Sequence, residues 1–279
     1  MACSVMREDR PMAEQWYKYV IVGGGRAGAS AVDGIRELDE GGTILVIGNE
    51  QELPYNRPPL TKDLWFGKKT LEKIFVHPPE YYTEKHAVLR RGLNVVSLDP
   101  AAKAVKDDAG ESFTYEKLLL ATGGRPRHLT LPGSELDGIS YYRYVSDYHT
   151  IRELAQPDRT AVVVGGGFIG SEIAAALNHS GVKVTMIYPE SYLVSRVFPE
   201  DLGRYLQKMY QERGIGIFSG NSPTAFERQD GKYITRTRTG DDLVSDFLII
   251  GAGIYPNIEL AESAGLRVEN GIMVDEYLR

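Results

Sequence analysis

Cysteine is almost absent from this chain of 279 residues, which contains only Cys3. A disulfide framework therefore cannot form, and paired cysteines that exchange thiols or bind zinc are excluded. The five histidines have no cysteine or carboxylate cluster beside them, so no metal site is predicted. So little cysteine is typical of proteins in a reducing compartment, and we expect a cytoplasmic location.

Long apolar runs are missing as well. No stretch approaches the roughly 20 apolar residues that a membrane-spanning helix needs, so no membrane span is predicted. The net charge of −6 argues against a surface for nucleic acid. Residues 1–18 lack the apolar core of a signal peptide, and we expect them to form a tail.

Two glycine-rich loops organise what is present. Each stands between a short apolar run and a helix-like segment, the context in which a G-x-G-x-x-G pattern predicts dinucleotide binding. Such glycines permit a tight turn, the approach of a pyrophosphate and close helix–strand packing. The phosphates would lie at a helix N-terminus. The glycines are Gly23, Gly25 and Gly28 after strand 19–22, and Gly165, Gly167 and Gly170 after strand 162–164.

The elements that follow the first loop recur after the second, which indicates an internal duplication. We therefore predict an α/β fold with two Rossmann-like βαβ domains, each with a central parallel sheet and a small antiparallel meander. The expected helices are 27–38 and 172–177, the second strands 43–47 and 182–187, the meanders 94–115 and 214–237, and the apolar strands that end in glycines 118–124 and 247–253.

The expected domain boundaries follow from this duplication. After the tail of residues 1–18, residues 19–127 form the first part of one nucleotide-binding domain. Residues 128–250 form the second domain. Residues 251–279 return to the first domain and leave it incomplete.

An acidic side chain at the end of the second strand of such a unit accepts hydrogen bonds from a ribose. In the first domain this position offers Glu50, with Asn49 as a neutral substitute; a solvated loop residue is the alternative for Glu50. Two prolines then stiffen the loop between Arg57 and Lys62, so both cations are held on a constrained backbone. Such cations suit phosphates or a reduced flavin, although a plain surface loop explains the prolines equally well.

These motifs, in this order, resemble the flavin-dependent pyridine nucleotide oxidoreductases of the glutathione-reductase structural class. The nearest subgroup is formed by the apoptosis-inducing-factor-like proteins and the NADH-dependent ferredoxin and rubredoxin reductases. The resemblance extends from about Lys18 to Arg279. It is carried by both glycine loops, Leu53–Tyr55, Arg57–Lys62, Tyr115–Lys117, Ala121–Gly124, Tyr188–Glu190 and Tyr255–Asn257.

The resemblance implies that FAD binds at the first loop and NAD(H) at the second. The cofactor-binding residues it indicates are Gly23, Gly25, Arg26, Ala27, Gly28, Asn49, Glu50, Arg57, Lys62, Val96, Ala121, Thr122, Gly123, Arg143, Gly165, Gly167, Phe168, Ile169, Gly170, Glu172, Glu190 and Gly253. Without the resemblance, Arg143 would be one residue of a Tyr-rich helix start.

The resemblance also indicates three catalytic residues. It places Lys62 opposite Glu172 beside the redox-active end of the flavin, and we expect Glu172 to lie just inside a helix N-terminus, where negative charge is favoured. Phe168 would stack on the nicotinamide or occupy its place until the coenzyme arrives. The alternatives are a helix-start acid without chemistry for Glu172 and a core side chain for Phe168.

Coenzyme preference is expected to depend on Glu190 at the end of strand 182–187. A carboxylate there binds the ribose 2′-hydroxyl and repels a 2′-phosphate. Ser191 and Tyr192, which follow, offer no arginine. The sequence therefore favours NADH over NADPH.

The expected function is that of an FAD-dependent NADH oxidoreductase that passes electrons to a ferredoxin, a rubredoxin or a quinone-like acceptor. A cysteine relay is excluded, because the region from Pro54 to Lys62 contains none. The alternatives are an NADH-sensing, apoptosis-inducing-factor-like interaction protein with slow turnover, or a fragment with an incomplete FAD site. In the family a Gly-Asp strand and an interface domain follow the position of Val274–Arg279, so we expect a truncated chain that dimerises only with the missing domain.

Overall fold

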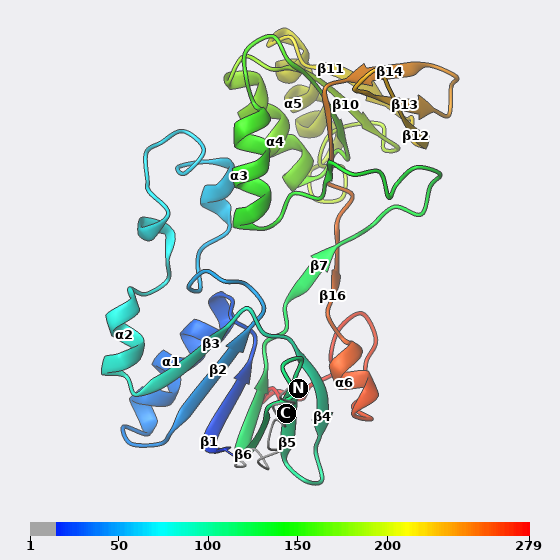
Figure 1. The fold of residues 1–279 in the computed structure, drawn as a ribbon. Helices are drawn as coiled ribbons and strands as arrows, with labels where there is room; N and C mark the ends of the chain where they lie inside the picture. The colour runs from blue at the N-terminus through cyan, green and yellow to red at the C-terminus, as the bar shows by residue number, and fades with distance from the viewer. Residues whose placement is uncertain (1–14) are drawn as a thin grey trace, which may run out of the picture. The chain divides into compact units, whose positions relative to one another are not determined.

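The computed structural model describes residues 15–279, which form two compact units (Figure 1). Unit 1 contains residues 15–56, 75–123 and 256–279, and unit 2 contains residues 57–74 and 124–255. Cys3 and the first 14 residues of the expected tail lie outside the described residues. Residues 15–18, expected in the tail, instead extend the first strand, since Gln15–Tyr17 pair with Phe113–Tyr115.

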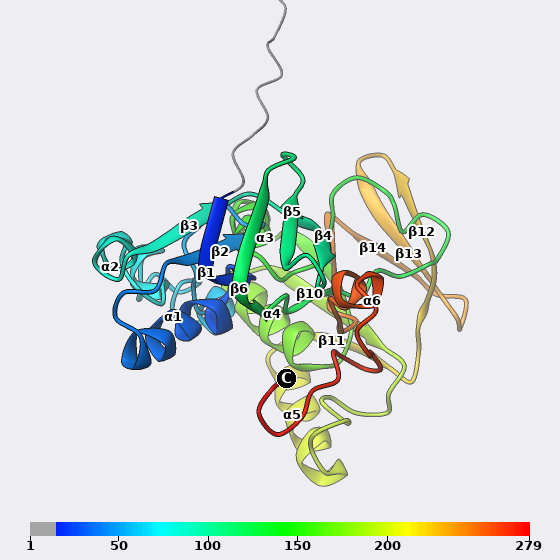
Figure 2. The same ribbon diagram turned by 90° about the horizontal axis from the view of Figure 1, so that it is seen from below.

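The core of unit 1 is a six-stranded sheet in the order β3-β2-β1-β6-β5-β4, whose last strands lie side by side in Figure 2. The pairs β1–β2, β2–β3 and β1–β6 are parallel, whereas β4–β5 and β5–β6 are antiparallel. The strands are β1 (Gln15–Val22), β2 (Ile44–Gly48), β3 (Ala87–Arg91), β4 (Val95–Asp99), β5 (Ala104–Asp107) and β6 (Ser112–Leu120).

One strand of this sheet was expected as two. We predicted that 112–115 would belong to the meander and 118–120 to the parallel sheet, but β6 runs through both as nine continuous residues. Residues 112–114 of β6 pair antiparallel with β5, and residues 113–120 run alongside β1. Tyr115–Lys117, which is polar enough to suggest a break, therefore lies inside the strand. The meander is thus an extension of the parallel sheet.

Helices cover the sheet of unit 1. Helix α1 (Arg26–Leu38) buries Ala29 and Val32 completely, and Val32 packs against Ile21, Ile44 and Val46. The returning chain adds α6 (Glu259–Ser263), whose Leu260 packs on the opposite cluster that contains Leu45 and Phe113. Helix α2 (Pro79–Glu84) precedes β3.

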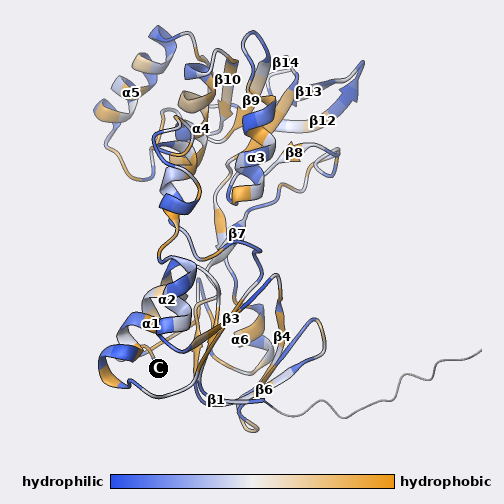
Figure 3. Ribbon diagram, turned by 60° about the vertical axis from the view of Figure 1, so that its left-hand side comes forward, coloured by the Kyte–Doolittle hydropathy of each residue, from blue (hydrophilic) through white to orange (hydrophobic). Residues whose placement is uncertain are grey.

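Unit 2 is built on a five-stranded, fully parallel sheet in the order β11-β10-β9-β15-β8. Beside it, β12, β13 and β14 form a three-stranded antiparallel sheet. In both units the hydrophobic residues concentrate in the parallel strands (Figure 3). The strands are β8 (Ile139–Ser140), β9 (Thr160–Val164), β10 (Lys183–Tyr188), β11 (Gly216–Ser219), β12 (Pro223–Gln229), β13 (Lys232–Thr237), β14 (Asp242–Ser245) and β15 (Phe247–Ile250).

The second meander is smaller than we predicted. Strand β11 was expected to open it, but residues 216–219 pair in parallel with Thr185–Tyr188 of β10 and so belong to the central sheet. Sequence periodicity reports that a strand is buried, not which partner it takes. The helices of unit 2 are η1 (Pro58–Thr61), η2 (Glu72–Ile74), α3 (Val145–Leu154), α4 (Phe168–His179) and α5 (Glu200–Glu212), and β7 (Gly124–Pro126) pairs with β16 (Ile254–Pro256).

The glycine loops of the two units have the same local geometry. The first glycine of each has a positive φ, +137° at Gly23 and +119° at Gly165. A Cβ at the third glycine would lie 2.0 Å from the carbonyl oxygen of Gly23 in one loop. The equivalent distance from Gly170 to the carbonyl of Gly165 is 2.1 Å. Only glycine therefore allows each helix to start this close to its strand, as the pattern predicts.

Gly28→Ala should destabilise the protein by about 1–3 kcal/mol, because the added methyl group overlaps a backbone oxygen that cannot move freely. Gly34→Ala, in the same helix, is the matched control. Its Cβ would meet no atom within 4 Å, so alanine's higher helix propensity should leave stability unchanged or raise it by up to about 1 kcal/mol. Urea unfolding of both variants checks this, and equal midpoints would refute the packing role of Gly28.

Candidate functional site

In unit 1, the first glycine loop leaves a helix N-terminus ready for an anion. Gly25 caps α1 in an extended conformation without a side-chain cap bond, and the first turn holds no acid. A Cβ at Gly25 would meet nothing within 4 Å among the described residues. The backbone N–H groups of a helix start favour negative charge, so the loop fits the pyrophosphate of a dinucleotide.

The acid expected after β2 has a defined partner. The hydroxyl of Tyr55 donates a hydrogen bond of 2.6 Å to Oε2 of Glu50. Glu50 is therefore not simply a solvated loop residue. Arg26, the first residue of α1, bonds Asn56, and its neighbour Ala27 is exposed. Asn49 and Val96 are exposed too.

At the end of β6, the predicted residues Ala121–Gly123 meet a residue to which we had assigned no role. Thr122 Oγ1 donates to the carbonyl of Asn257 at 2.7 Å, and Asn257 Nδ2 donates to the carbonyl of Thr122 at 2.8 Å. This reciprocal pair fixes the returning chain beside the first loop, because the carbonyl of Ala121 itself lies against Gly23. The Tyr255–Asn257 motif was the only sequence signal for Asn257.

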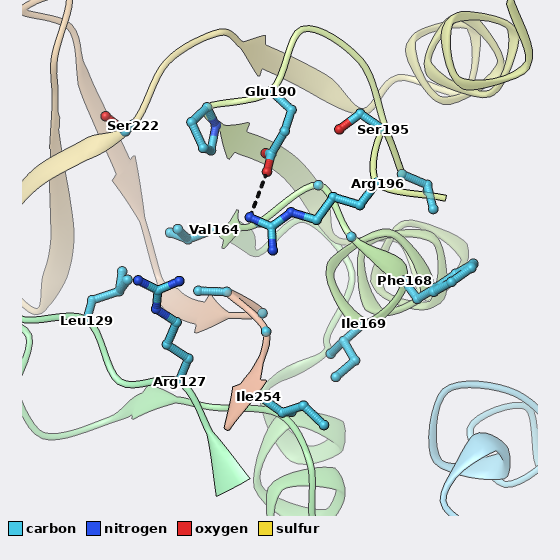
Figure 4. A pocket seen from close by; sticks show the side chains of 18 of the residues that line it. Arg127, Leu129, Val164, Phe168, Ile169, Glu190, Ser195, Arg196, Ser222 and Ile254 are labelled. Carbon is cyan, nitrogen blue, oxygen red and sulfur yellow. Dashed lines mark hydrogen bonds and ion pairs between the residues drawn. The ribbon is translucent and has the colours of Figure 1, made fainter. Parts of the chain in front are cut away.

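In unit 2, the second glycine loop opens into a cavity of about 650 Å³ (Figure 4). This volume is in the range of small-molecule sites. Gly167 caps α4 as Gly25 caps α1, and a Cβ there also meets nothing within 4 Å of the described residues. Of the predicted residues, those that line the cavity are Arg143, Gly165, Gly167, Phe168, Ile169, Glu190 and Gly253; Gly170 and Glu172 do not.

Two arginines of the cavity wall were not predicted. Arg127 follows β7, and Arg196 lies six residues after Glu190. Nη2 of Arg196 is 3.5 Å from Oε1 of Glu190, so a cation does reach the carboxylate although the next two residues supply none. Which loop residue turns back towards Glu190 depends on the backbone path, which the sequence spacing does not reveal.

The predicted pair of Lys62 and Glu172 is formed within unit 2. Lys62 Nζ lies 2.5 Å from Glu172 Oε2, and Thr61 Oγ1 donates to the same oxygen at 2.6 Å. One detail of the expectation is wrong, because Glu172 is the fifth residue of α4 and lies beyond its first turn. Its side chain is also 36% exposed. The carboxylate of Glu172 is therefore stabilised by Lys62 and Thr61, and not by the helix dipole or by burial.

The segment that carries Lys62 is fastened by other contacts. Trp65 is 2% exposed, and its Nε1 donates at 3.1 Å to the carbonyl of Ala176 near the end of α4. Tyr142 donates to the carbonyl of Leu60 at 2.8 Å. A half-exposed ion pair contributes about 0–1 kcal/mol, whereas a buried aromatic ring contributes about 3–5 kcal/mol when compared with alanine. Trp65 therefore determines where Lys62 lies.

Two further predicted residues lie together in unit 2. Arg57 Nη1 donates to the carbonyl of Arg143 at 3.0 Å, and its guanidinium lies 5.1 Å from the centre of the Tyr144 ring. Prolines at the start of η1 hold Arg57 at one end of the turn and Lys62 at the other. This arrangement is the constrained presentation of two cations that the prolines predict.

Other chemistries receive no support from the described residues. Residues 15–279 contain no group of three or more His, Cys, Asp or Glu side chains arranged to hold a metal. Within the same range, no helix is both long and apolar enough to cross a bilayer. Each unit by itself offers a helix start with open space beside its cap glycine and an acidic residue after the following strand.

In the comparison with protein families, the family model of the pyridine nucleotide-disulphide oxidoreductases matches residues 17–279. Among curated proteins, the chain is 38% identical over 262 residues to the ferredoxin–NAD(+) reductase component of the anthranilate 1,2-dioxygenase system of Burkholderia cepacia. That alignment covers 94% of this chain and 64% of the relative.

Two further relatives have similar coverage. The rubredoxin-NAD(+) reductase of Pseudomonas putida is 33% identical over 262 residues, which are 93% of this chain and 68% of that protein. A crystal structure of the covalent putidaredoxin reductase–putidaredoxin complex matches with a TM-score of 0.90 and 32% identity, over 94% of this chain and 64% of that one. The chain thus spans about two thirds of the length of these relatives.

Proposed function

Because the chain belongs to the pyridine nucleotide-disulphide oxidoreductase family, we propose that it is an FAD-dependent NADH oxidoreductase that delivers electrons to a small ferredoxin or rubredoxin. The observation that carries the proposal is the duplicated loop: Gly25 and Gly167 each leave open space at the start of a helix. Two dinucleotides are needed for this reaction, and the chain has two such helix starts.

Each unit contributes binding and orientation. When bound, NADH would supply a hydride, and FAD would accept it and provide single electrons. The N-termini of α1 and α4 would hold the two pyrophosphates, and Glu50 and Glu190 would accept hydrogen bonds from ribose hydroxyls. Since Cys3 is the only cysteine, no pair of thiols relays the electrons, and an external carrier receives them directly.

Two valine substitutions separate the roles of the loops. Gly25 and Gly167 have φ values of −92° and −83°, which valine adopts, and a Cβ at either position would meet no atom within 4 Å among the described residues, its chain neighbours apart. Gly25→Val should reduce the flavin content of the purified protein at least tenfold and leave NAD⁺ affinity unchanged. Gly167→Val should keep the flavin and weaken NAD⁺ binding at least tenfold, because its side chain fills the space for the pyrophosphate.

Visible flavin absorbance, calorimetric NAD⁺ titration and NADH-driven reduction of added ferredoxin or rubredoxin are the three measurements. Thermal unfolding of each variant provides the control for folding. Both variants should lose NADH-driven turnover, each for its own reason. If neither substitution changes flavin content or NAD⁺ affinity, the duplicated-loop interpretation is wrong.

We further propose that Lys62 stabilises the negative charge of the reduced flavin. The Glu172 carboxylate, to which Thr61 donates a hydrogen bond, holds the Lys62 ammonium group in place. Lys62→Met should slow flavin reduction by NADH by roughly tenfold, since one charge-stabilising group is lost. Lys69→Met is the matched control: this lysine of the same segment pairs with Asp63 at 3.0 Å and is similarly exposed. Anaerobic stopped-flow measurements of flavin reduction compare the two variants. Equal reduction rates would show that Lys62 has no role in this step.

NADH is the proposed coenzyme, because the Glu190 carboxylate in the cavity repels a 2′-phosphate. Glu190→Gln removes this repulsion and frees Arg196 to bind the phosphate, so the ratio of kcat/KM for NADPH to that for NADH should rise about tenfold. Arg196→Ala added to that variant should abolish the gain. Glu200→Gln, which disturbs an exposed pair with Arg204 on α5, is the control. An unchanged ratio in Glu190→Gln excludes Glu190 from coenzyme choice.

A further inference from the structure

One wall of the cavity in unit 2 is formed by a single stretch between β10 and α5, residues 189–199, which we call the wall segment. It contributes six lining residues: Pro189, Glu190, Val194, Ser195, Arg196 and Val197. Phe198 belongs to the same stretch but does not line the cavity. Its ring instead contacts Phe168, which does.

The wall segment is tied to the second glycine loop at a strained residue. Val194 has a φ of +56°, a conformation that a β-branched side chain rarely adopts, and it is 4% exposed. Its N–H donates to the carbonyl of Gly166 at 2.7 Å. Strain of this kind persists only where the surroundings over-determine the backbone, and it concentrates at functional sites.

The other end of the wall segment is fixed as well. The N–H groups of Val197 and Phe198 both donate to the carbonyl of Val194 at 2.9 Å. Pro199 then caps α5. Within α5, a Cβ at Gly203 would lie 2.3 Å from the Tyr192 ring, so the helix packs tightly on the segment. The backbone of Phe198 is therefore held from both sides.

Phe168, the first residue of α4, is 50% exposed at the rim of the cavity. Its ring meets that of Phe198 edge to face, with centroids 6.0 Å apart and planes at 88°. In Figure 4 the ring points away from the ion pair of Glu190 and Arg196. An exposed aromatic ring has several open rotamers, and Phe198 selects one of them.

We propose that Phe198 is a positioning residue that holds the Phe168 ring at the rim, so that the nicotinamide end of the coenzyme enters beside an ordered surface. The inference rests on the proposed function, because it assigns the end of the cavity far from Glu190 to the nicotinamide. Without Phe198, the Phe168 ring samples more rotamers, and binding has to order it.

The role of Phe198 is tested by comparing the binding of NAD⁺ with that of ADP-ribose. NAD⁺ has the nicotinamide, whereas ADP-ribose is the same molecule without it. Phe198→Ala should weaken NAD⁺ binding by roughly three- to tenfold, the size of one aromatic pair, and leave the affinity for ADP-ribose unchanged. Phe198→Tyr retains the ring and should restore NAD⁺ affinity. Tyr205→Ala, an exposed aromatic residue of α5 outside the cavity wall, should alter neither affinity.

A double-mutant comparison asks whether Phe198 acts through Phe168. Phe168→Ala and the double variant Phe168→Ala/Phe198→Ala should bind NAD⁺ equally well. Calorimetric titrations of all variants with both ligands provide the data. Additive losses in the double variant, or an equal loss of ADP-ribose affinity in Phe198→Ala, overturn the inference while the proposed function stands. Wild-type protein that binds neither ligand overturns the proposed function and the inference with it.

Discussion

The structure depends on one close approach, made once in each unit. The helix after each glycine loop starts so near its strand that the third glycine lies against the carbonyl of the first, Gly28 on Gly23 and Gly170 on Gly165. Any side chain at the third position would push the helix away. The approach leaves open space beside Gly25 and Gly167 at the start of each helix, where the N–H groups of the first turn have no competing side-chain cap and would be free to bind a pyrophosphate. The proposed anion sites are thus a consequence of helix–strand packing.

Much of the fold could be predicted from the sequence, because these elements are specified locally. The glycine spacing, the β-branched runs and the acids after the second strands all act over a few residues, so both βαβ units were predicted with their strands and helices. The pairing of strands that are far apart in the sequence could not be predicted. Strand β11 looks like a meander strand, and β6 looks like two, because burial and polarity do not say which neighbour a strand takes.

The candidate site, too, could be predicted only in part. The contact between Lys62 and Glu172 was predicted from a resemblance, while its physical basis was misjudged, because the carboxylate lies beyond the first helical turn. No local signal places residues 57–74 in unit 2. Their position depends on Trp65, which reaches the carbonyl of Ala176 from 111 residues away in sequence. Arg196 and Asn257 were missed for the same reason, since the backbone path brings each to its partner.

The division of the chain into units has a consequence for the order in which they can be completed. Unit 2 consists of residues 57–74 and 124–255, all enclosed in sequence by the parts of unit 1. Unit 1 needs Leu260 and Ala264 for its core and Asn257 beside its glycine loop. During synthesis from the N-terminus, every residue of unit 2 has therefore been made before unit 1 has its last core residues. Helix α1, whose start comes first in the sequence, therefore belongs to unit 1, the unit that receives its core residues last.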